Sequence, residues 1–282
     1  MMGGGINVYS SVFSMEDVEI HDNLCYGTVY TGINDVGHGG GLFLNQTWGT
    51  LDNMNIHHNT ASMNGGGVWS SEGSAWTMTN SNVSDNIAPY NGGGFGFWNH
   101  NGEDLNATLI NVTIENNIAQ PGWFVGHGGG VWAYNSSTVF QDCIIRNNTA
   151  GGNGGGVNYY DGGWPELYNC VIDGNTSNAI GGGVYIHDEG GWNNNGLTMD
   201  RCLVINNSSN TFAGAISSAG NAGINRITNS TIVGNSGGGA AVEAYNASGL
   251  EVFNSIIWGN SPSNFDNEFG ITFGDGFVSH SN

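Results

Sequence analysis

The stretch NTAGGNGGGV (148–157) decides the fold, because close copies of it recur along the chain as NTASMNGGGV (59–68) and NIAPYNGGGF (86–95). The first six intervals between successive glycine triplets are 36, 26, 27, 36, 26 and 27 residues. A spacing that repeats in this way indicates an internal repeat. The triplets begin at Gly3, Gly39, Gly65, Gly92, Gly128, Gly154, Gly181 and Gly237, with a degenerate copy at Ala213-Gly214-Ala215.

A second recurring segment lies between the triplets and ends on asparagine. Segments such as LINVTIENN (109–117) and FQDCIIRNN (140–148) alternate apolar and polar residues before that asparagine. Alternation with a period of two predicts a short strand in each copy. The nine copies end at Asn23, Asn59, Asn86, Asn117, Asn148, Asn175, Asn207, Asn235 and Asn260.

The composition of the repeat distinguishes between the possible repeat folds. Leucine-rich, ankyrin and TPR repeats have similar periods, but they need helices. Each unit here is rich in Gly, Asn, Ser and Thr, which are poor helix formers. The sequence therefore predicts an all-β fold, a right-handed parallel β-helix of about nine coils with one repeat per coil. We expect residues 1–282 to form one domain, with 261–282 as an irregular C-terminal extension.

Stacked coils assign a role to each recurring residue type. The asparagine that closes each segment is expected to bond to the asparagine of the next coil, forming a ladder. The glycines permit a turn with positive φ and leave room for a narrow corner. Cys143, Cys170 and Cys202 occupy one column of the repeat. We interpret them as inward-facing core residues rather than metal ligands, because free cysteines are commonly buried.

The charge of the chain restricts its partners. Among 282 residues there are 23 acidic and three basic side chains, which gives a net charge of −20. Nucleic acids and anionic membranes require Lys or Arg to neutralise phosphate, so we expect neither as a partner. No apolar run is long enough to cross a bilayer, so we expect no membrane insertion. An acidic surface of this kind suits divalent cations.

The motif N-[TI]-A followed by G-G-G resembles the repeats of secreted right-handed β-helix proteins. It is similar to the repeats of polymorphic outer-membrane and autotransporter-like adhesins. The stretch NSIIWGNSPSNF (254–265) resembles the closing coil of large bacterial surface proteins that continue into an anchoring region. The resemblance implies an extracellular or cell-surface location, a structural or adhesive role, and a chain that is part of a larger surface protein.

The sequence GHGGG occurs twice, at 37–41 and 126–130, and could be mistaken for a catalytic motif. An esterase oxyanion hole would need a nucleophile between a strand and a helix, and no helix is predicted. Polygalacturonases share the β-helix fold, but they need converging Asp residues, which do not accompany His38 or His127. We interpret both copies as corners of a coil.

Outward-facing aromatic residues follow the glycine triplets, where alternate residues point away from the core. A row of rings along a rod could bind glycans, contact a partner protein, or stabilise the sheet by cross-strand stacking. All three interpretations stay open. The predicted ligand-binding residues are Phe43, Trp69, Trp98, Trp132, Tyr134, Tyr160, Tyr185 and His187.

Acidic residues recur just after this aromatic row. Carboxylates at coil spacing could coordinate Ca²⁺, but no EF-hand loop occurs and solvated, solubilising loops are the favoured interpretation. No other cofactor is predicted. The predicted calcium ligands are Glu72, Asp161, Asp188 and Glu189.

The segments that end on asparagine change polarity along the chain. Their outward residues are polar in the early copies and apolar in the later ones, which predicts that another subunit or segment covers this face. The residues of this predicted self-association face are Ile144, Val171, Leu203, Ile205, Val233, Ile256 and Trp258.

These features predict a non-enzymatic extracellular β-helix that is structural or adhesive and binds glycans or other surface proteins along its aromatic face. The alternative is a carbohydrate-active enzyme of the same fold, either a polysaccharide lyase or a glycoside hydrolase. Clustered carboxylates beside the aromatic face would favour the enzyme.

Overall fold

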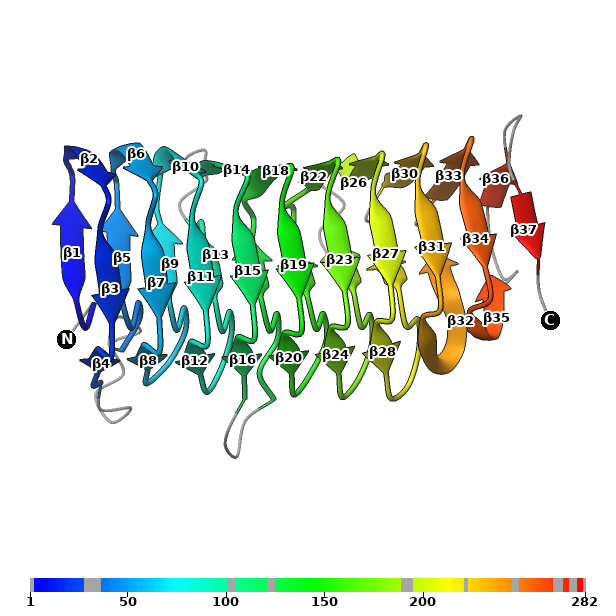
Figure 1. Ribbon diagram of the computed structural model, residues 1–282, viewed down its shortest axis with the longest axis horizontal. Helices are drawn as coiled ribbons and strands as arrows, with labels where there is room; N and C mark the ends of the chain where they lie inside the picture. The colour runs from blue at the N-terminus through cyan, green and yellow to red at the C-terminus, as the bar shows by residue number, and fades with distance from the viewer. Residues whose placement is uncertain are drawn as a thin grey trace.

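The computed structural model is a rod of stacked coils, with early strands at one end and late strands at the other (Figure 1). Every regular element of the residues it describes is a β-strand. These residues are 3–27, 37–100, 105–120, 125–188, 195–220, 223–244, 249–265, 271–273 and 278–280. The all-β solenoid expected from the repeat is therefore confirmed.

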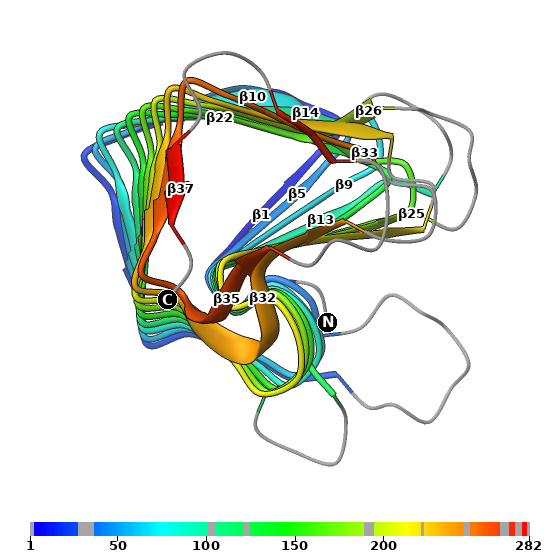
Figure 2. The ribbon, with the colours of Figure 1, turned by 90° about the vertical axis from the view of Figure 1, so that its right-hand side faces the viewer.

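The coil is right-handed, as the repeat predicts. In Figure 2 the C-terminal end of the rod faces the viewer, and the chain runs counter-clockwise as successive coils approach. A path that turns counter-clockwise while it approaches the observer is a right-handed helix. Every strand pairs in parallel with its equivalents in the coils before and after it, so three sheets run along the rod.

Sheet I contains two strands from most coils, a four- or five-residue strand after the glycine triplet and a two-residue strand before it. Near the C-terminus the nine-residue β32 includes its triplet, and β35 has five residues. The longer strands are β1 (Ile6–Tyr9), β5 (Leu42–Asn45), β9 (Val68–Ser71), β13 (Phe95–Trp98), β17 (Val131–Tyr134), β21 (Val157–Tyr160), β25 (Val184–Asp188), β29 (Ile216–Gly220) and β32 (Ser236–Ala244). The others are β4 (Leu24–Cys25), β8 (Thr60–Ala61), β12 (Ile87–Ala88), β16 (Ile118–Ala119), β20 (Thr149–Ala150), β24 (Thr176–Ser177), β28 (Ser208–Ser209) and the terminal β35 (Ser261–Phe265).

Sheets II and III contain ten strands each, close to the nine coils expected. Their last strands lie within 261–282, where we expected an irregular extension. Sheet II comprises β2 (Val12–Glu16), β6 (Trp48–Asp52), β10 (Ala75–Thr79), β14 (Asn106–Ile110), β18 (Ser137–Gln141), β22 (Pro165–Tyr168), β26 (Asn195–Asp200), β30 (Ile224–Thr228), β33 (Gly249–Phe253) and β36 (Ile271–Phe273). Sheet III comprises β3 (Glu19–His21), β7 (Asn55–His57), β11 (Asn82–Ser84), β15 (Thr113–Glu115), β19 (Ile144–Arg146), β23 (Val171–Asp173), β27 (Leu203–Ile205), β31 (Thr231–Val233), β34 (Ile256–Trp258) and β37 (Val278–His280).

The glycine triplets form the corner that leads into each longer strand of sheet I. Gly65, the first of its triplet, has φ +66°, which favours glycine. A Cβ on the second glycine, Gly66, would collide with the carbonyl oxygen of Gly93 in the next coil, and one on Gly67 would lie 2.8 Å from the carbonyl oxygen of Gly94. The triplet is thus required both for the turn and for the close approach of adjacent coils.

The predicted asparagine ladder runs beside the third glycine of the triplets, where a Cβ on Gly130 would lie 3.0 Å from Nδ2 of Asn148. The Nδ2 atom of Asn117 donates to Oδ1 of Asn148 at 3.0 Å, and Asn148 donates in the same way to Asn175 at 2.9 Å. From Asn59 to Asn260, each Nδ2 also donates to a backbone carbonyl, as Asn148 does to Ile114 at 2.9 Å. Oδ1 of Asn148 accepts the backbone N–H of Asn117. Eight such side-chain bonds join all nine asparagines, from Asn23 to Asn260.

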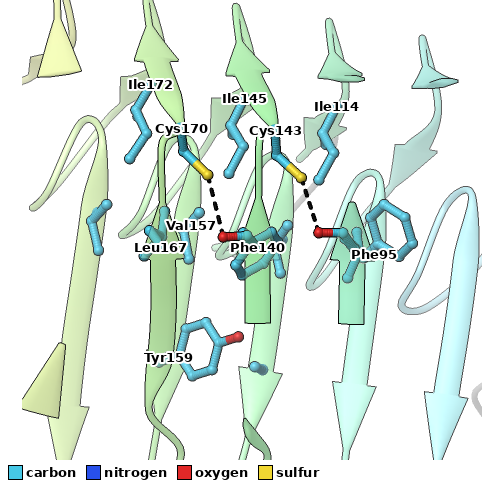
Figure 3. Close-up of a cluster of buried hydrophobic side chains, with 14 of the residues drawn as sticks. Phe95, Ile114, Phe140, Cys143, Ile145, Val157, Tyr159, Leu167, Cys170 and Ile172 are labelled. Carbon is cyan, nitrogen blue, oxygen red and sulfur yellow. Dashed lines mark hydrogen bonds between the residues drawn. The ribbon is translucent and has the colours of Figure 1, made fainter. Parts of the chain in front are cut away.

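Inward-pointing side chains of the three sheets fill the rod with one continuous apolar core. Cys143, Cys170 and Cys202 are buried free cysteines in this core, as the column predicts. Figure 3 shows the thiol of Cys170 directed toward Phe140, to whose carbonyl oxygen it donates at 3.4 Å. Cys143 bonds in the same way to the carbonyl of Leu109 at 3.3 Å.

Candidate functional site

The outer face of sheet I carries two columns of side chains. The inner column, from Phe43 onward, is Phe43, Trp69, Gly96, Trp132, Asn158 and Tyr185. The outer column, two residues further along each strand, is Tyr9, Asn45, Ser71, Trp98, Tyr134, Tyr160 and His187. All eight predicted aromatic-face residues therefore lie on this one face, separate from the core of the rod.

The inner column is more buried than the sequence suggests. Phe43, Trp69, Trp132 and Tyr185 are only 3–6% exposed, so the expectation that these rings face solvent is wrong. The coil bends back on itself between the two strands of sheet I (Figure 2). His38, beside the glycine triplet, stacks on Trp69 and covers part of that ring. Trp98, Tyr134, Tyr160 and His187 of the outer column are partly exposed.

The rings stack on one another along the rod. Trp98 and Tyr134 have centroids 4.6 Å apart and planes 18° apart, and Tyr134 and Tyr160 follow at 6.2 Å. Tyr160 in turn lies 5.1 Å from His187. Rings stacked at coil spacing cover each other's faces and expose mainly their edges, so cross-strand stacking accounts for this part of the row.

The outer column is interrupted in the early coils, and this gap forms a notch. Between Tyr9 and Trp98 the column contains Asn45 and Ser71, which bond to each other at 2.9 Å. Tyr9 and Trp98 are three coils apart, about 14 Å by strand spacing. We call the resulting concavity, with a volume of about 630 Å³, the aromatic notch. It is lined by Tyr9, His38, Phe43, Asn45, Met63, Asn64, Trp69, Ser71, Glu72, Trp98 and His100.

The two ends of the notch expose aromatic surface. On its C-terminal side Trp98 is covered by Tyr134, but on the other side its column continues with Ser71, which is too small to cover an indole. The ring of His100, which also lines the notch, stacks on Trp98 with centroids 6.1 Å apart and planes 22° apart. At the other end Tyr9 is 45% exposed and contacts Phe43 at 5.2 Å.

His38, from the first GHGGG copy, forms the opposite rim of the notch. Its ring stacks on Trp69 with centroids 4.5 Å apart, and its Nδ1 accepts a hydrogen bond from the amide of Asn64 at 3.1 Å. His38 is 6% exposed. It therefore helps to position the buried indole of Trp69 beneath the notch.

Both GHGGG histidines belong to a second ladder that the sequence analysis did not identify. The backbone N–H of Asn91 donates to Asn64, that of His127 to Asn91, and that of Asn153 to Nδ1 of His127 at 3.0 Å. Burial lowers the pKa of His127, which favours the neutral ring that can accept this bond. The signal was present in the sequence, since Asn64, Asn91 and Asn153 each immediately precede a glycine triplet, as His38 and His127 do.

The predicted calcium ligands are only partly brought together. Asp161 and Asp188 follow β21 and end β25 in adjacent coils, and Asp161 accepts a hydrogen bond from the Tyr134 hydroxyl at 3.2 Å. Glu72 lies three coils from Asp161, about 14 Å by strand spacing. Glu189 falls outside the described residues. Among the described residues no three His, Cys, Asp or Glu side chains converge as metal ligands, and the calcium site stays a prediction.

The predicted self-association face lies on the outside of sheet III. Ile144 pairs with Val171 and Val171 with Leu203, while Ile205 pairs with Val233 and Val233 with Trp258. These residues therefore form two neighbouring apolar columns. Ile144, Ile256 and Trp258 are 36–49% exposed.

The part of the chain that the structure describes contains no helix long and apolar enough to cross a membrane. Comparison of the chain with protein-family models, with curated proteins and with solved structures finds no match.

Proposed function

We propose that this chain is an extracellular structural or adhesive β-helix that binds a neutral glycan in the aromatic notch without chemically changing it. The observation that carries the proposal is the gap in the outer column, where Asn45 and Ser71 replace the rings found in later coils. Ligand sites commonly combine aromatic walls with a few polar groups that fix orientation.

The polar groups of the notch are of the kind that hydrogen-bond sugar hydroxyls. Asn45, Asn64 and Ser71 offer amide and hydroxyl groups, and Glu72 offers a carboxylate. The C–H face of a sugar ring would pack against the uncovered side of Trp98. This combination supports a glycan rather than a purely apolar ligand.

Charge supports a neutral glycan over an acidic one. The chain has no lysine, and each of its three arginines forms an ion pair outside the notch. Arg146 pairs with Glu115 at 2.6 Å, Arg201 with Asp200 at 2.9 Å and Arg226 with Glu251 at 2.8 Å. Uronate, sialate or sulfate groups would enter a strongly acidic molecule with no cation to receive them.

The surface location rests on the likeness of the GGG and asparagine repeats to those of polymorphic outer-membrane and autotransporter-like adhesins. A rod held by ladders and a continuous core suits a rigid stalk that presents a binding site. Other surface proteins, or a second copy at the apolar face of sheet III, are further partners that fit this role.

The competing function is a polysaccharide lyase or glycoside hydrolase of the same fold. Most glycoside hydrolases use two carboxyl groups about 5–10 Å apart. Glu72 is the one carboxylate of the described notch lining, and Asp161 and Asp188 lie coils away. This arrangement supports binding over hydrolysis.

A glycan array combined with a reducing-end release assay tests the proposal. Trp98→Ala should abolish binding, whereas Tyr160→Ala, the same kind of change further along the outer column, should leave it intact. Binding without release of reducing ends supports the proposed function. Release of reducing ends would favour the enzyme, and binding that survives Trp98→Ala would place the ligand elsewhere.

A further inference from the structure

Three histidines gather on the outer face of sheet III, at its polar end and away from the aromatic notch. His21 ends β3 and pairs with His57 at the end of β7, and His58 follows at the corner. The rings of His21 and His57 stack, with centroids 5.2 Å apart and planes 5° apart. This cluster is independent of the proposed glycan site.

The contacts of His57 fix the state of its ring. Its Nε2 lies 2.9 Å from Oε1 of Glu19, and since an ionised carboxylate can only accept, Nε2 carries the proton. The amide of Asn55 donates to the same oxygen at 3.3 Å, which holds Glu19 in place. In a neutral imidazole Nδ1 then has a free lone pair, and here it points at Nδ1 of His58, 2.7 Å away.

The Nδ1 atoms of His57 and His58 are close enough to bind one metal ion together. In the metal-free protein a proton occupies the position between them. A metal about 2.0–2.1 Å from each nitrogen would subtend an angle of roughly 80°, close to that of adjacent ligands in octahedral or square-planar coordination. A metal-bound histidine usually donates its second N–H to a carboxylate, which is the contact that His57 makes with Glu19.

Two carboxylates near His58 could serve as further metal ligands. Asp22, His58 and Asp85 occupy the same corner position of three consecutive coils, with φ between 55° and 56° for the aspartates and 54° for His58. Coils are about 4.8 Å apart, so either carboxylate lies one coil from an ion at His58. Asp22 would have to exchange its contact with Nδ1 of His21, 2.8 Å away, for the metal. Because no three such ligands already converge among the described residues, water and one aspartate would complete the shell.

We propose that Nδ1 of His57 and Nδ1 of His58 bind a divalent transition-metal ion. Binding replaces the proton between the two nitrogens: as the two metal–nitrogen bonds form, this proton leaves Nδ1 of His58 and Nε2 of the same ring takes up a proton from solvent, so both rings bind as neutral imidazoles. Glu19 is a positioning residue that keeps Nδ1 of His57 directed at the metal. Imidazole ligands favour zinc, nickel and copper over calcium and magnesium.

Calorimetric titration of the full chain with zinc chloride, in excess magnesium to occupy non-specific acidic sites, tests this proposal. The wild type should bind one zinc ion, and His58→Asn should weaken binding at least tenfold. Asn116 and Asn147 occupy the same corner at φ 56° and 54°, so asparagine suits this position and the variant should fold. The matched control, His127→Asn, changes a histidine on another face and should bind zinc as the wild type does.

Nitrogen-15 NMR of the histidine rings identifies the ligating atoms. Zinc should shift Nδ1 of His57 and of His58 while leaving His127 unchanged. Glu19→Gln should move the proton of His57 toward Nδ1 in the metal-free ring and weaken zinc binding, without changing the melting temperature. Wild-type affinity no higher than that of His58→Asn, or shifts confined to other histidines, would overturn the proposal.

Discussion

Trp69 and Trp132 stack with ring centroids 6.2 Å apart and planes 11° apart, although a whole coil lies between them. The residue between them in the inner column is Gly96, the one inner-column position with no side chain. The ring of Trp69 lies over that glycine, and a Cβ there would be 2.5 Å from Cε3 of the indole. Gly96 therefore makes the space in which the two indoles meet beside the aromatic notch.

Gly96→Ala should destabilise the rod, because the added methyl group must displace a buried indole. Overpacking of this kind costs about 1–3 kcal/mol. Chemical denaturation followed by tryptophan fluorescence measures the loss. Gly249→Ala is the control, since its Cβ would come no closer than 3.3 Å to any neighbour, with Cγ1 of Ile224 nearest and backbone atoms at 3.7 Å and beyond. Equal effects of the two changes would contradict the role assigned to Gly96.

Asn148→Ala should be among the most destabilising single changes in the ladder. Asn148 is fully buried, and its removal takes the Oδ1 acceptor from the backbone N–H and Nδ2 of Asn117 and takes the Nδ2 donor from the carbonyl of Ile114. Oδ1 of Asn175 loses one of two donors, because the backbone N–H of residue 148 still reaches it. Each buried unpaired group costs about 1–3 kcal/mol, so the loss should reach about 3 kcal/mol or more.

The terminal rung provides the comparison. Asn23→Ala should cost much less, because Asn23 is only half-buried and, as the first asparagine of the ladder, it supports no earlier ladder asparagine. Urea denaturation of both variants measures the difference. Similar losses for the two variants would show that the ladder is not what stabilises this corner.

His127→Asn should remove part of the acid sensitivity of the fold. The pKa of His127 is lowered by burial, so the unfolded chain takes up a proton at a higher pH than the folded chain. The stability that this neutral histidine contributes is complete above about pH 6.5 and is lost as pH falls toward the lowered value.

An asparagine at position 127 can accept the same backbone hydrogen bond through its Oδ1, as Asn64, Asn91 and Asn153 do in other coils. The free energy of unfolding should therefore fall more between pH 7.5 and pH 5 in the wild type than in His127→Asn. Identical pH dependence in the two proteins would contradict the role of Nδ1 of His127 as the acceptor for Asn153.

The apolar columns of sheet III should drive self-association. Replacing both Ile144 and Ile256 with lysine places charge on this exposed face and should shift the chain toward monomer in sedimentation analysis. Thr113→Lys, on the polar half of the same sheet, is the control and should leave the distribution unchanged. A wild-type chain that is monomeric at all concentrations would refute this expectation.

The ladder and the glycine corners could be predicted because stacking makes equivalent residues repeat in the sequence. Asn148 and Gly65 follow from spacing alone, and so does the assignment of Trp98 to the outer face. The alternation of residues along a strand predicts which side chains point away from the core. It does not predict how the chain bends within one coil. The burial of Trp69 could not be predicted for that reason, since it depends in part on the stacking of His38 on its ring.

The notch and the histidine cluster depend on register between coils of unequal length. Tyr9 and Trp98 are 89 residues apart, and Tyr9 was not among the residues predicted for the aromatic row. His21 and His57 are separated by 36 residues and meet only because their strands pair. Such contacts become visible only when each coil is aligned residue by residue.

The aromatic notch as a binding site is tested most directly by closing it. Ser71→Tyr continues the column of Tyr134 and Tyr160 into the gap and should fill the space beside Trp98. Calorimetric titration of wild type and Ser71→Tyr with the best neutral glycan from the array, alongside their melting temperatures, is the decisive measurement. We predict that Ser71→Tyr folds as stably as the wild type and loses glycan binding. A folded Ser71→Tyr that binds with wild-type affinity would contradict the assignment of the notch as the binding site.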